Sequence, residues 1–327
     1  MNRIAGLFIS SIVLFIMIFS YTISLADVNE EVENIFNIMK MYEKSIYNGK
    51  GKFIYELKRS NDSIKYLESI IDKESNLLIA KGIDPKNINI TSHLLYHINC
   101  IIEGEKIRCD IEIIDPGAGS QGSEIWIYNG EDTKYFYKKV GMKKGFVLPG
   151  CHIMKGYQFE NEYNFLTMSY LSSYKNGIHY KISEIIENAY LQKNSDYFDL
   201  SIIGKAFQDS LDCTVISFIE NNNGKHISHK LWLAPSYSYM PIKHVIDDGK
   251  ILVQIQYRKY DNDIVFPSKI DEYLFSDSGS LIIDHTLISL ENNWEFNKMI
   301  PNDQFQMNLP SGIPIYDEYT DKHYISK

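Results

Sequence analysis

The sequence predicts a mainly β protein of the α+β class, in which a curved antiparallel sheet forms an open β-barrel covered by helices. Two hairpins alternate apolar and polar residues, which is typical of strands with one buried face. Tyr (24) and Phe (16) are frequent and Pro (9) is scarce among the 327 residues, which suits long strands. Helical spacing is confined to a few segments, so we expect helices to pack on the apolar face of the sheet.

The first 26 residues have the layout of a secretory signal peptide. Arg3 supplies the positive start, an apolar run follows, and Ser24 and Ala26 place small residues before a cleavage point. We expect cleavage after Ala26, which leaves 27–327 as a single domain. The alternative is an uncleaved N-terminal membrane anchor, because the apolar run is long enough to span a bilayer.

The charge of the chain argues against nucleic acid as a partner. The formal net charge is -9, and loss of Arg3 with the signal peptide makes it -10. An acidic surface repels the phosphate backbone, and it repels an anionic membrane surface for the same reason.

The order of elements follows from the periodicity of apolar residues. A helix is expected over 27–47, a strand over 52–58, a helix over 61–81, four strands between 89 and 138, a helix over 159–174, and mainly strands from 196 onward. Gly82 is a helix-ending residue, so the segment near 61–82 is interpreted as a helical insertion between strands.

The first hairpin is centred on Gly104-Glu105. Glycine at the first central position suits a type II′ turn, and this turn places Cys100 directly opposite Cys109 in a non-hydrogen-bonded pair. The register gathers on one face Leu94, Tyr96, Ile98, Cys100, Ile102, Ile107, Cys109, Ile111 and Ile113. The other face is mostly polar, although Leu95 and Ile101 also fall on it.

The four cysteines of an exported chain predict two disulfides. Cys100 and Cys109 are interpreted as a cross-strand bridge, and Cys151 and Cys213 as a second bridge between distant parts of the chain. A metal site would need further soft ligands nearby, and a redox pair would more usually be C-x-x-C.

The second hairpin turns at Asp248-Gly249, a type I′ signal. It pairs Ile246 with Ile251, His244 with Val253, and Ile242 with Ile255 on one apolar face.

The other sequence motifs are better explained by structural roles than by catalysis or ligand binding. Gly117, Gly119 and Gly122 match G-x-G-x-x-G, but a strand pattern follows where a dinucleotide site needs a helix. His226 and His229 lie three apart on a strand pattern and therefore point to opposite faces. No nucleophile elbow is present, so we expect no catalytic residues, cofactor or metal. A hydrolase whose catalytic residues lie far apart in the sequence is a further hypothesis, and His244 is the first residue to test for it.

Several stretches resemble the LolA-like superfamily of outer-membrane lipoprotein-sorting proteins, which includes LolA, LolB and the periplasmic regulator RseB. An N-terminal helix runs into a strand at NGKGKFIYELKRS. The stretches that follow are SEIWIYNGEDTKYF, HKLWLAPSYSYMPIKH, DIVFPSKIDEY and FQMNLPSGIPIYDE, the last with Ile315 in place of the usual Val. In this order they cover most of 28–318. The chain is longer than a typical carrier of this kind, and none of the carriers' ligand-contacting residues can be matched to it.

The resemblance implies a fold of about eleven antiparallel strands in an open barrel lidded by helices. It implies a Gram-negative periplasmic location, where the sequons at Asn61 and Asn89 have no meaning for glycosylation. It also implies a function, which is to hold the acyl chains of lipoproteins, or another lipid, in transit between membranes. An inner- or outer-membrane protein would then be a second partner.

We therefore predict a carrier that binds lipid or lipoprotein in an apolar half-barrel cavity. The expected lining residues are Leu94, Tyr96, Ile98, Ile111, Ile113, Ile242, Ile246, Ile251, Val253, Ile255 and Tyr257. The alternative is an envelope sensor or regulator that uses the same fold for protein contacts.

Overall fold

The structure is a computed structural model. It describes residues 30–80, 90, 92–104, 106–117, 119–139, 150–155, 174–175, 178–179, 181–191, 196–222, 224–289 and 294–327. The expected signal peptide at 1–26 and nearly all of the expected helix over 159–174 lie outside these residues. Among the described residues, no helix combines the length and apolar character needed to cross a membrane.

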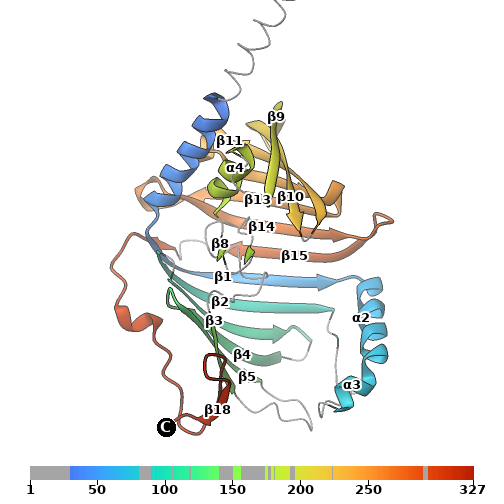
Figure 1. Cartoon of the computed structure of the whole chain (residues 1–327), viewed down its shortest axis with the longest axis vertical. Coiled ribbons are helices and arrows are strands. Elements are labelled where there is room, and N and C mark those ends of the chain that lie inside the picture. Colours follow the sequence, from blue (N-terminus) through green and yellow to red (C-terminus); the bar gives the residue numbers. More distant parts are fainter. Residues whose placement is uncertain are drawn as a thin grey trace, which may run out of the picture.

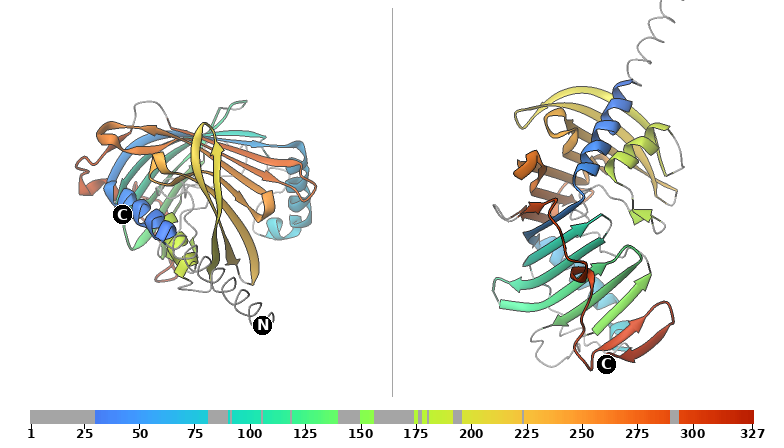
Figure 2. Two further views of the ribbon diagram at one scale, coloured as in Figure 1. Left: turned by 90° about the horizontal axis from the view of Figure 1, so that it is seen from above. Right: turned by 90° about the vertical axis from the view of Figure 1, so that its left-hand side faces the viewer.

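One large curved sheet dominates the molecule (Figures 1 and 2). Its strands are β1 (Asn48–Arg59), β2 (His93–Glu103), β3 (Lys106–Asp115), β4 (Gly119–Tyr128), β5 (Asp132–Lys139), β6 (Gly150–Lys155), β9 (Tyr197–Gln208), β10 (Leu211–Asn222), β11 (Lys225–Ala234), β12 (Met240–Ile246), β13 (Ile251–Lys259), β14 (Val265–Phe275), β15 (Leu281–Ser289), β16 (Glu295–Phe296), β17 (Pro314–Asp317) and β18 (Lys322–Ile325). A separate pair is formed by β7 (Tyr174–Lys175) and β8 (Ile178–His179).

The sheet consists of two antiparallel meanders joined through β1, and the hairpin β17–β18 is added to β6 through a parallel pairing. The order of strands is β18-β17-β6-β5-β4-β3-β2-β1-β15-β14-β13-β12-β11-β10-β9, and β16 adds to the end of β1. The end strands β18 and β9 do not pair with each other, so the barrel is open as expected. The sheet has 16 strands, which exceeds the eleven implied by the resemblance.

Both hairpin registers are confirmed. Cys100 lies opposite Cys109, and Gly104 has the positive φ of +57° that the turn requires. In the second hairpin, His244 lies opposite Val253. The third expected pair, Ile242 with Ile255, is absent from this ladder, which begins at the pair of Lys243 with Gln254. Strand β12 is irregular here, with a register shift against β11.

Two helical regions agree with the expected segments in position, whereas the helix α4 (Ile182–Leu191) was not expected from the sequence. The described part of the first helix covers 30–45. The expected helix over 61–81 is instead divided into α2 (Asn61–Lys73) and α3 (Ser75–Ala80). The interruption lies in the polar run 72–76, where no apolar residue is available to continue a buried stripe.

The helix at 30–45 and α4 lie against the concave face of the sheet at its β9–β12 end (Figure 2). Their apolar side chains bury one cluster with the sheet: Val32, Ile35, Phe36, Met39, Ile182, Ile185, Ile186, Ala189, Tyr197, Ile216, Phe218, Leu231, Leu233 and Met240. By contrast, α2 and α3 stand at the ends of strands β1 and β2 (Figure 1), and Ser63 is the buried residue of α2. The first two helices therefore cover the β9–β12 part of the concave face, whereas α2 and α3 lie beyond the ends of the strands.

The expected Cys151–Cys213 bridge is wrong. Both residues carry free thiols, and they belong to two separate apolar clusters on β6 and β10, near opposite ends of the sheet. Cys151 contacts the Met307 sulfur at 3.9 Å, while the Cys213 thiol lies 3.6 Å from the Leu211 carbonyl. A disulfide needs Cα atoms within about 7 Å, and the intervening strands prevent this.

Candidate functional site

The candidate site is the apolar concave face of the sheet. Cross-strand neighbours form rows on it, because residues directly opposite each other in a ladder share a face. One row runs from Tyr55 on β1 through Tyr96 on β2 to Ile113 on β3. In the other meander, a row runs from Leu231 on β11 through His244 to Val253.

Most of the expected cavity residues meet on this face. Nine of them belong to one apolar cluster: Leu94, Tyr96, Ile98, Ile111, Ile113, Ile251, Val253, Ile255 and Tyr257. Ile242 lies instead in a smaller cluster with Cys213 and Ala234. Ile246 is half-buried at the end of β12. Two hairpins far apart in the sequence therefore supply one continuous apolar surface.

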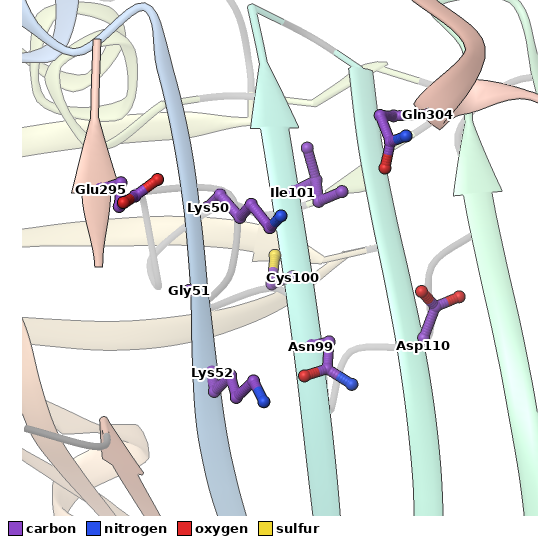
Figure 3. A pocket seen from close by; sticks show the side chains of 9 residues that line it. All are labelled: Lys50, Gly51, Lys52, Asn99, Cys100, Ile101, Asp110, Glu295 and Gln304. Carbon is purple, nitrogen blue, oxygen red and sulfur yellow. The ribbon is translucent and has the colours of Figure 1, made fainter. Parts of the chain in front are cut away.

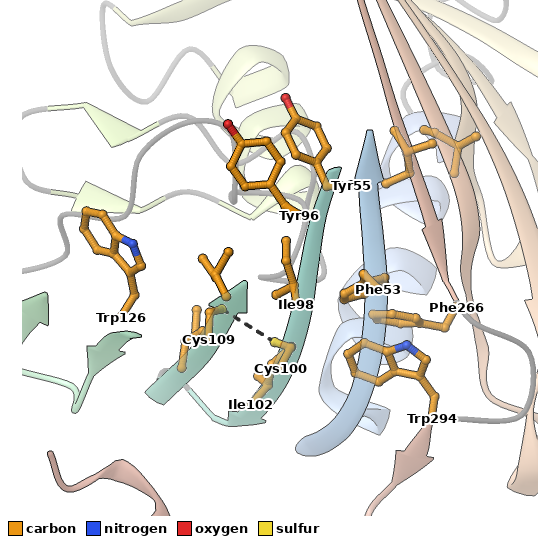
Figure 4. Close-up of a cluster of buried hydrophobic side chains, with 14 of the residues drawn as sticks. Phe53, Tyr55, Tyr96, Ile98, Cys100, Ile102, Cys109, Trp126, Phe266 and Trp294 are labelled. Carbon is orange, nitrogen blue, oxygen red and sulfur yellow. Dashed lines mark hydrogen bonds between the residues drawn. The ribbon is translucent and has the colours of Figure 1, made fainter. Parts of the chain in front are cut away.

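The cluster is completed by aromatic side chains that pattern reasoning from the sequence missed (Figure 4). Trp294 lies 4.8 Å from Phe53 and 4.6 Å from Phe266, measured between ring centroids. The Trp294 ring rests directly on the backbone of Gly51, where a Cβ atom would lie 2.3 Å from the ring. Gly51 is the sequence feature that could have indicated this contact, because a glycine within a strand often marks the close approach of another group to the backbone.

Helices contribute little to this cluster. Its fully buried members lie on strands or in short connections, and Tyr42 is the residue of the helix at 30–45 that packs against it among the described residues. The neighbouring cluster under that helix is by contrast filled by helical side chains. The concave face thus has a helix-covered part over β9–β12 and a part over β1–β5 and β13–β14 that these two helices leave uncovered.

Cys100 and Cys109 lie on the concave face within the cluster (Figure 4). Their sulfur atoms are 3.9 Å apart, and both side chains are fully buried as free thiols, so the expected cross-strand bridge is not formed in this structure. Burial, and secondarily the adjacent Cys100, raise the pKa of the Cys109 thiol well above its usual range. A thiol held protonated in this way is a poor nucleophile, which argues against Cys109 as a catalytic nucleophile.

Three titratable side chains form a chain across β10, β11 and β12. Glu220 Oε2 lies 3.1 Å from His229 Nε2, and His229 Nδ1 lies 3.0 Å from His244 Nε2. The His229 ring also stacks on Phe218 at 4.7 Å. Burial, and secondarily His229, lower the pKa of His244 well below its usual value, so His244 is neutral at physiological pH. The other ring nitrogen, His244 Nδ1, has no hydrogen-bond partner among the residues that the structure describes.

The other sequence motifs have structural roles. His226 points away from His229, as expected for residues three apart on a strand, and its exposed ring contacts Phe198. Gly119 and Gly122 lie in β4, so the glycine motif leads into a strand. In the described part of the chain, no group of three or more His, Cys, Asp or Glu side chains is arranged to hold a metal ion.

The opposite, convex face carries a polar hollow of about 520 Å³ (Figure 3). It is lined by Lys50, Gly51, Lys52, Asn99, Cys100, Ile101, Asp110, Glu295 and Gln304. Its polar rim does not match the expected apolar cavity, which lies on the other side of the same strands. The hollow therefore does not correspond to the sequence-predicted site.

The convex face explains why Ile101 departs from the polar pattern of its face. A short helical turn, η6 (Asn302–Phe305), crosses the sheet there, and Phe305 packs on Ile101 and Ile127. Arg108 donates a hydrogen bond of 2.9 Å to the Gln304 carbonyl and ties this turn to β3. An apolar residue on the polar face of the hairpin thus marks the docking place of the C-terminal segment.

Comparisons with known proteins find neighbours among solved structures. No protein-family model matches the chain, and no curated protein matches its sequence. A domain described as an outer membrane lipoprotein-sorting protein from Vibrio parahaemolyticus aligns with 10% identity and a TM-score of 0.45, over 84% of this chain and 97% of that chain. A DUF1329 family protein from Desulfovibrio piger aligns with 8% identity and a TM-score of 0.46, over 84% and 97%.

A third structure is a LolA superfamily protein from Nitrosomonas europaea. It aligns with 10% identity and a TM-score of 0.41, over 83% of this chain and 96% of that chain. The descriptions of two of these three structures name lipoprotein sorting or the LolA superfamily.

Proposed function

We propose that the protein is a lipid- or lipoprotein-binding carrier of the periplasm, which holds acyl chains at the part of its concave face that the helix at 30–45 and α4 do not cover. The observation that carries the proposal is the joining of hairpins β2–β3 and β12–β13 in one apolar cluster. Covering apolar area contributes roughly 25 cal/mol per Å², so two acyl chains along such a surface would be bound strongly. Binding of this kind needs no catalytic residue.

The test is native mass spectrometry of the exported protein, followed by organic extraction. We expect copurified acyl species in the wild type and their loss in Val253→Asp. Val253 is 6% exposed on the concave face, directly opposite His244 and Glu272, so an aspartate there places a charge within the apolar surface. A folded Val253→Asp protein that keeps its lipid would overturn the proposed site.

The matched control is Leu252→Asp. Leu252 adjoins Val253 on β13 but faces the other side of the sheet, as alternation along a strand requires. The Leu252→Asp variant also replaces an aliphatic side chain of β13 with aspartate, and it should leave lipid retention intact. A second variant without charge, Ile113→Phe, narrows the surface beside Tyr96 and should reduce the amount of bound lipid. It keeps the test decisive where Val253→Asp does not fold.

The second candidate function is an envelope sensor or regulator that works through protein contacts. It is favoured by β9, which forms one edge of the large sheet and exposes 74% of Phe207 and 53% of Ile203. Unpaired edge strands with apolar side chains accept a strand from another chain. A protein partner captured without lipid, and lost in Phe207→Asp, would favour this function over the carrier.

A further inference from the structure

The chain Glu220–His229–His244 ends in a buried atom that lacks a partner. The side chains of Glu220 and His229 are 14% and 9% exposed, and His244 is 1% exposed. Among the described residues, two buried side-chain polar atoms have no hydrogen bond, His244 Nδ1 and Trp294 Nε1. Such atoms are rare, because burying one without a partner costs free energy that folding does not recover.

The order of hydrogen bonds determines what His244 Nδ1 can bind. An ionised Glu220 carboxylate only accepts hydrogen bonds, so the facing His229 Nε2 carries a proton. His229 Nδ1 is then the acceptor for a proton on His244 Nε2. In the neutral His244 ring the remaining nitrogen, Nδ1, has a lone pair and no hydrogen. It therefore accepts a hydrogen bond and cannot donate one.

The surroundings of His244 place this acceptor on the proposed lipid-binding face. Leu231 and Val253 lie directly opposite it on the two neighbouring strands. Leu231 belongs to the helix-covered cluster and Val253 to the uncovered one, so His244 lies at the boundary between them. A ligand held against the Val253 side of this boundary would lie next to His244.

We propose that His244 Nδ1 accepts a hydrogen bond from a hydroxyl or amide N–H group of an amphipathic ligand whose chains lie on the concave face. This inference rests on the proposed lipid-binding function and adds a chemical preference to it. Ligands that carry only acceptors near the apolar chain, such as ethers, methyl esters or an ionised carboxylate, would leave the nitrogen unpaired. Acyl groups joined through an amide or carrying a free hydroxyl would pair with it.

The test uses two probes that differ in one hydrogen-bond donor, dodecanol and dodecyl methyl ether. Each displaces a pyrene-labelled acyl chain from the delipidated full-length protein. We expect the wild type to bind the alcohol about three- to tenfold more tightly than the ether, which corresponds to one net hydrogen bond. His244→Phe should bind the two probes equally, because it fills the same space without an acceptor.

His226→Phe is the matched control, since His226 lies on β11 outside the Glu220 chain and should keep the preference. Equal binding of both probes by the wild type would overturn the inference and leave the lipid-binding function standing. Displacement by neither probe would overturn both. If His244→Phe does not fold, the ring ¹⁵N NMR signals of His244 in the wild type provide the test. The Nδ1 signal should shift when dodecanol is added and stay unchanged with the ether. An unchanged Nδ1 signal with dodecanol overturns the proposal.

Discussion

Position 51 requires glycine because of a contact and not because of its backbone conformation. A Cβ atom there would lie 2.3 Å from the Trp294 ring, well inside van der Waals contact. Trp294 is itself buried among Phe53, Phe266 and Phe296, so it has no space to move into. The glycine thus allows an indole ring to lie flat on β1.

We predict that Gly51→Ala lowers the free energy of unfolding by about 1–3 kcal/mol, the usual cost of overpacking a core. Urea unfolding followed by tryptophan fluorescence measures it. Lys52→Ala, at the adjacent exposed position, is the control and should change stability by less than about 0.5 kcal/mol. Equal effects of the two variants would show that the Trp294 contact does not restrict position 51.

The residues Cys100 and Cys109 stand in a geometry that permits a bridge. Cα atoms in a non-hydrogen-bonded antiparallel pair are about 4.5 Å apart, within the range of natural disulfides. We predict that the exported protein contains the Cys100–Cys109 disulfide and keeps Cys151 and Cys213 as thiols. Intact-mass measurement should give a loss of one pair of hydrogens, abolished in Cys100→Ser. A loss of two pairs would contradict the separation of Cys151 from Cys213.

At the scale of elements, a buried carboxylate joins the two covering helices. Glu43, near the end of the helix at 30–45, accepts hydrogen bonds from Ser183 at the start of α4, 2.5 Å from Oγ and 3.2 Å from the backbone N–H. Glu43 is 6% exposed and Ser183 is fully buried. The side chain thus caps the first turn of α4 from a neighbouring helix. Burial raises the pKa of Glu43, and the hydrogen bonds from Ser183 lower it by less.

The raised pKa of Glu43 predicts a pH dependence of stability. The folded protein keeps the proton to higher pH than the unfolded chain, so ΔG of unfolding falls as pH rises. The stabilising contribution is fully present below the ordinary carboxyl pKa of 4.5 and is lost as pH passes through the folded value. Urea unfolding should show this slope in the wild type relative to Glu43→Gln, which cannot ionise. Parallel curves for the two proteins would mean that Glu43 does not titrate on folding.

The segment with α2 and α3 is a candidate for removal. The chain leaves the sheet at Arg59 and returns beside it, where Arg59 N–H donates to the Ser92 carbonyl at 2.9 Å. We predict that a short Gly/Ser loop in place of 61–91 keeps the fold, changes ΔG of unfolding by about 1 kcal/mol or less, and leaves lipid retention unchanged. Thermal melts measure the fold and its stability, and native mass spectrometry measures lipid retention. Loss of lipid with an intact fold would instead make the segment part of the binding site.

For the whole molecule, sequence reasoning succeeded where the contacts were local. The turns at Gly104 and Asp248-Gly249 determine their hairpins, and alternation then assigns the faces. Pairing of β1 with β15 was not predictable, because no turn connects them and only tertiary packing selects the partner. The cover over β9–β12 and the contact of Phe305 with Ile101 depend on docking of distant segments. The Cys151–Cys213 prediction was wrong for this reason. These two cysteines were paired only because the other two had already been assigned, and the sequence does not tell how far apart they lie in space.

The difference between local contacts and contacts of distant segments also explains which residues of the candidate site could be predicted. Nine of the eleven expected lining residues share a cluster because both hairpins carried a clear apolar face. Trp294 and Phe296 escaped detection because the strand β16 has only two residues and Trp294 precedes it, so no periodic pattern is present. The chain of Glu220, His229 and His244 also escaped, since its members lie on three strands and only the bulged pairing of β11 with β12 brings the two imidazoles together.

The pairing of β1 with β15 also has a consequence for synthesis on the ribosome. Within each meander every strand finds its partner as soon as the next strand emerges. The first strand is different, because its register joins Phe53 to Ser289 and Tyr55 to Leu287. One edge of β1 therefore stays open while more than half of the polypeptide is translated, and an open apolar edge invites pairing with the wrong chain. A nascent chain of this topology needs either chaperone protection of β1 or delay of its folding until after export.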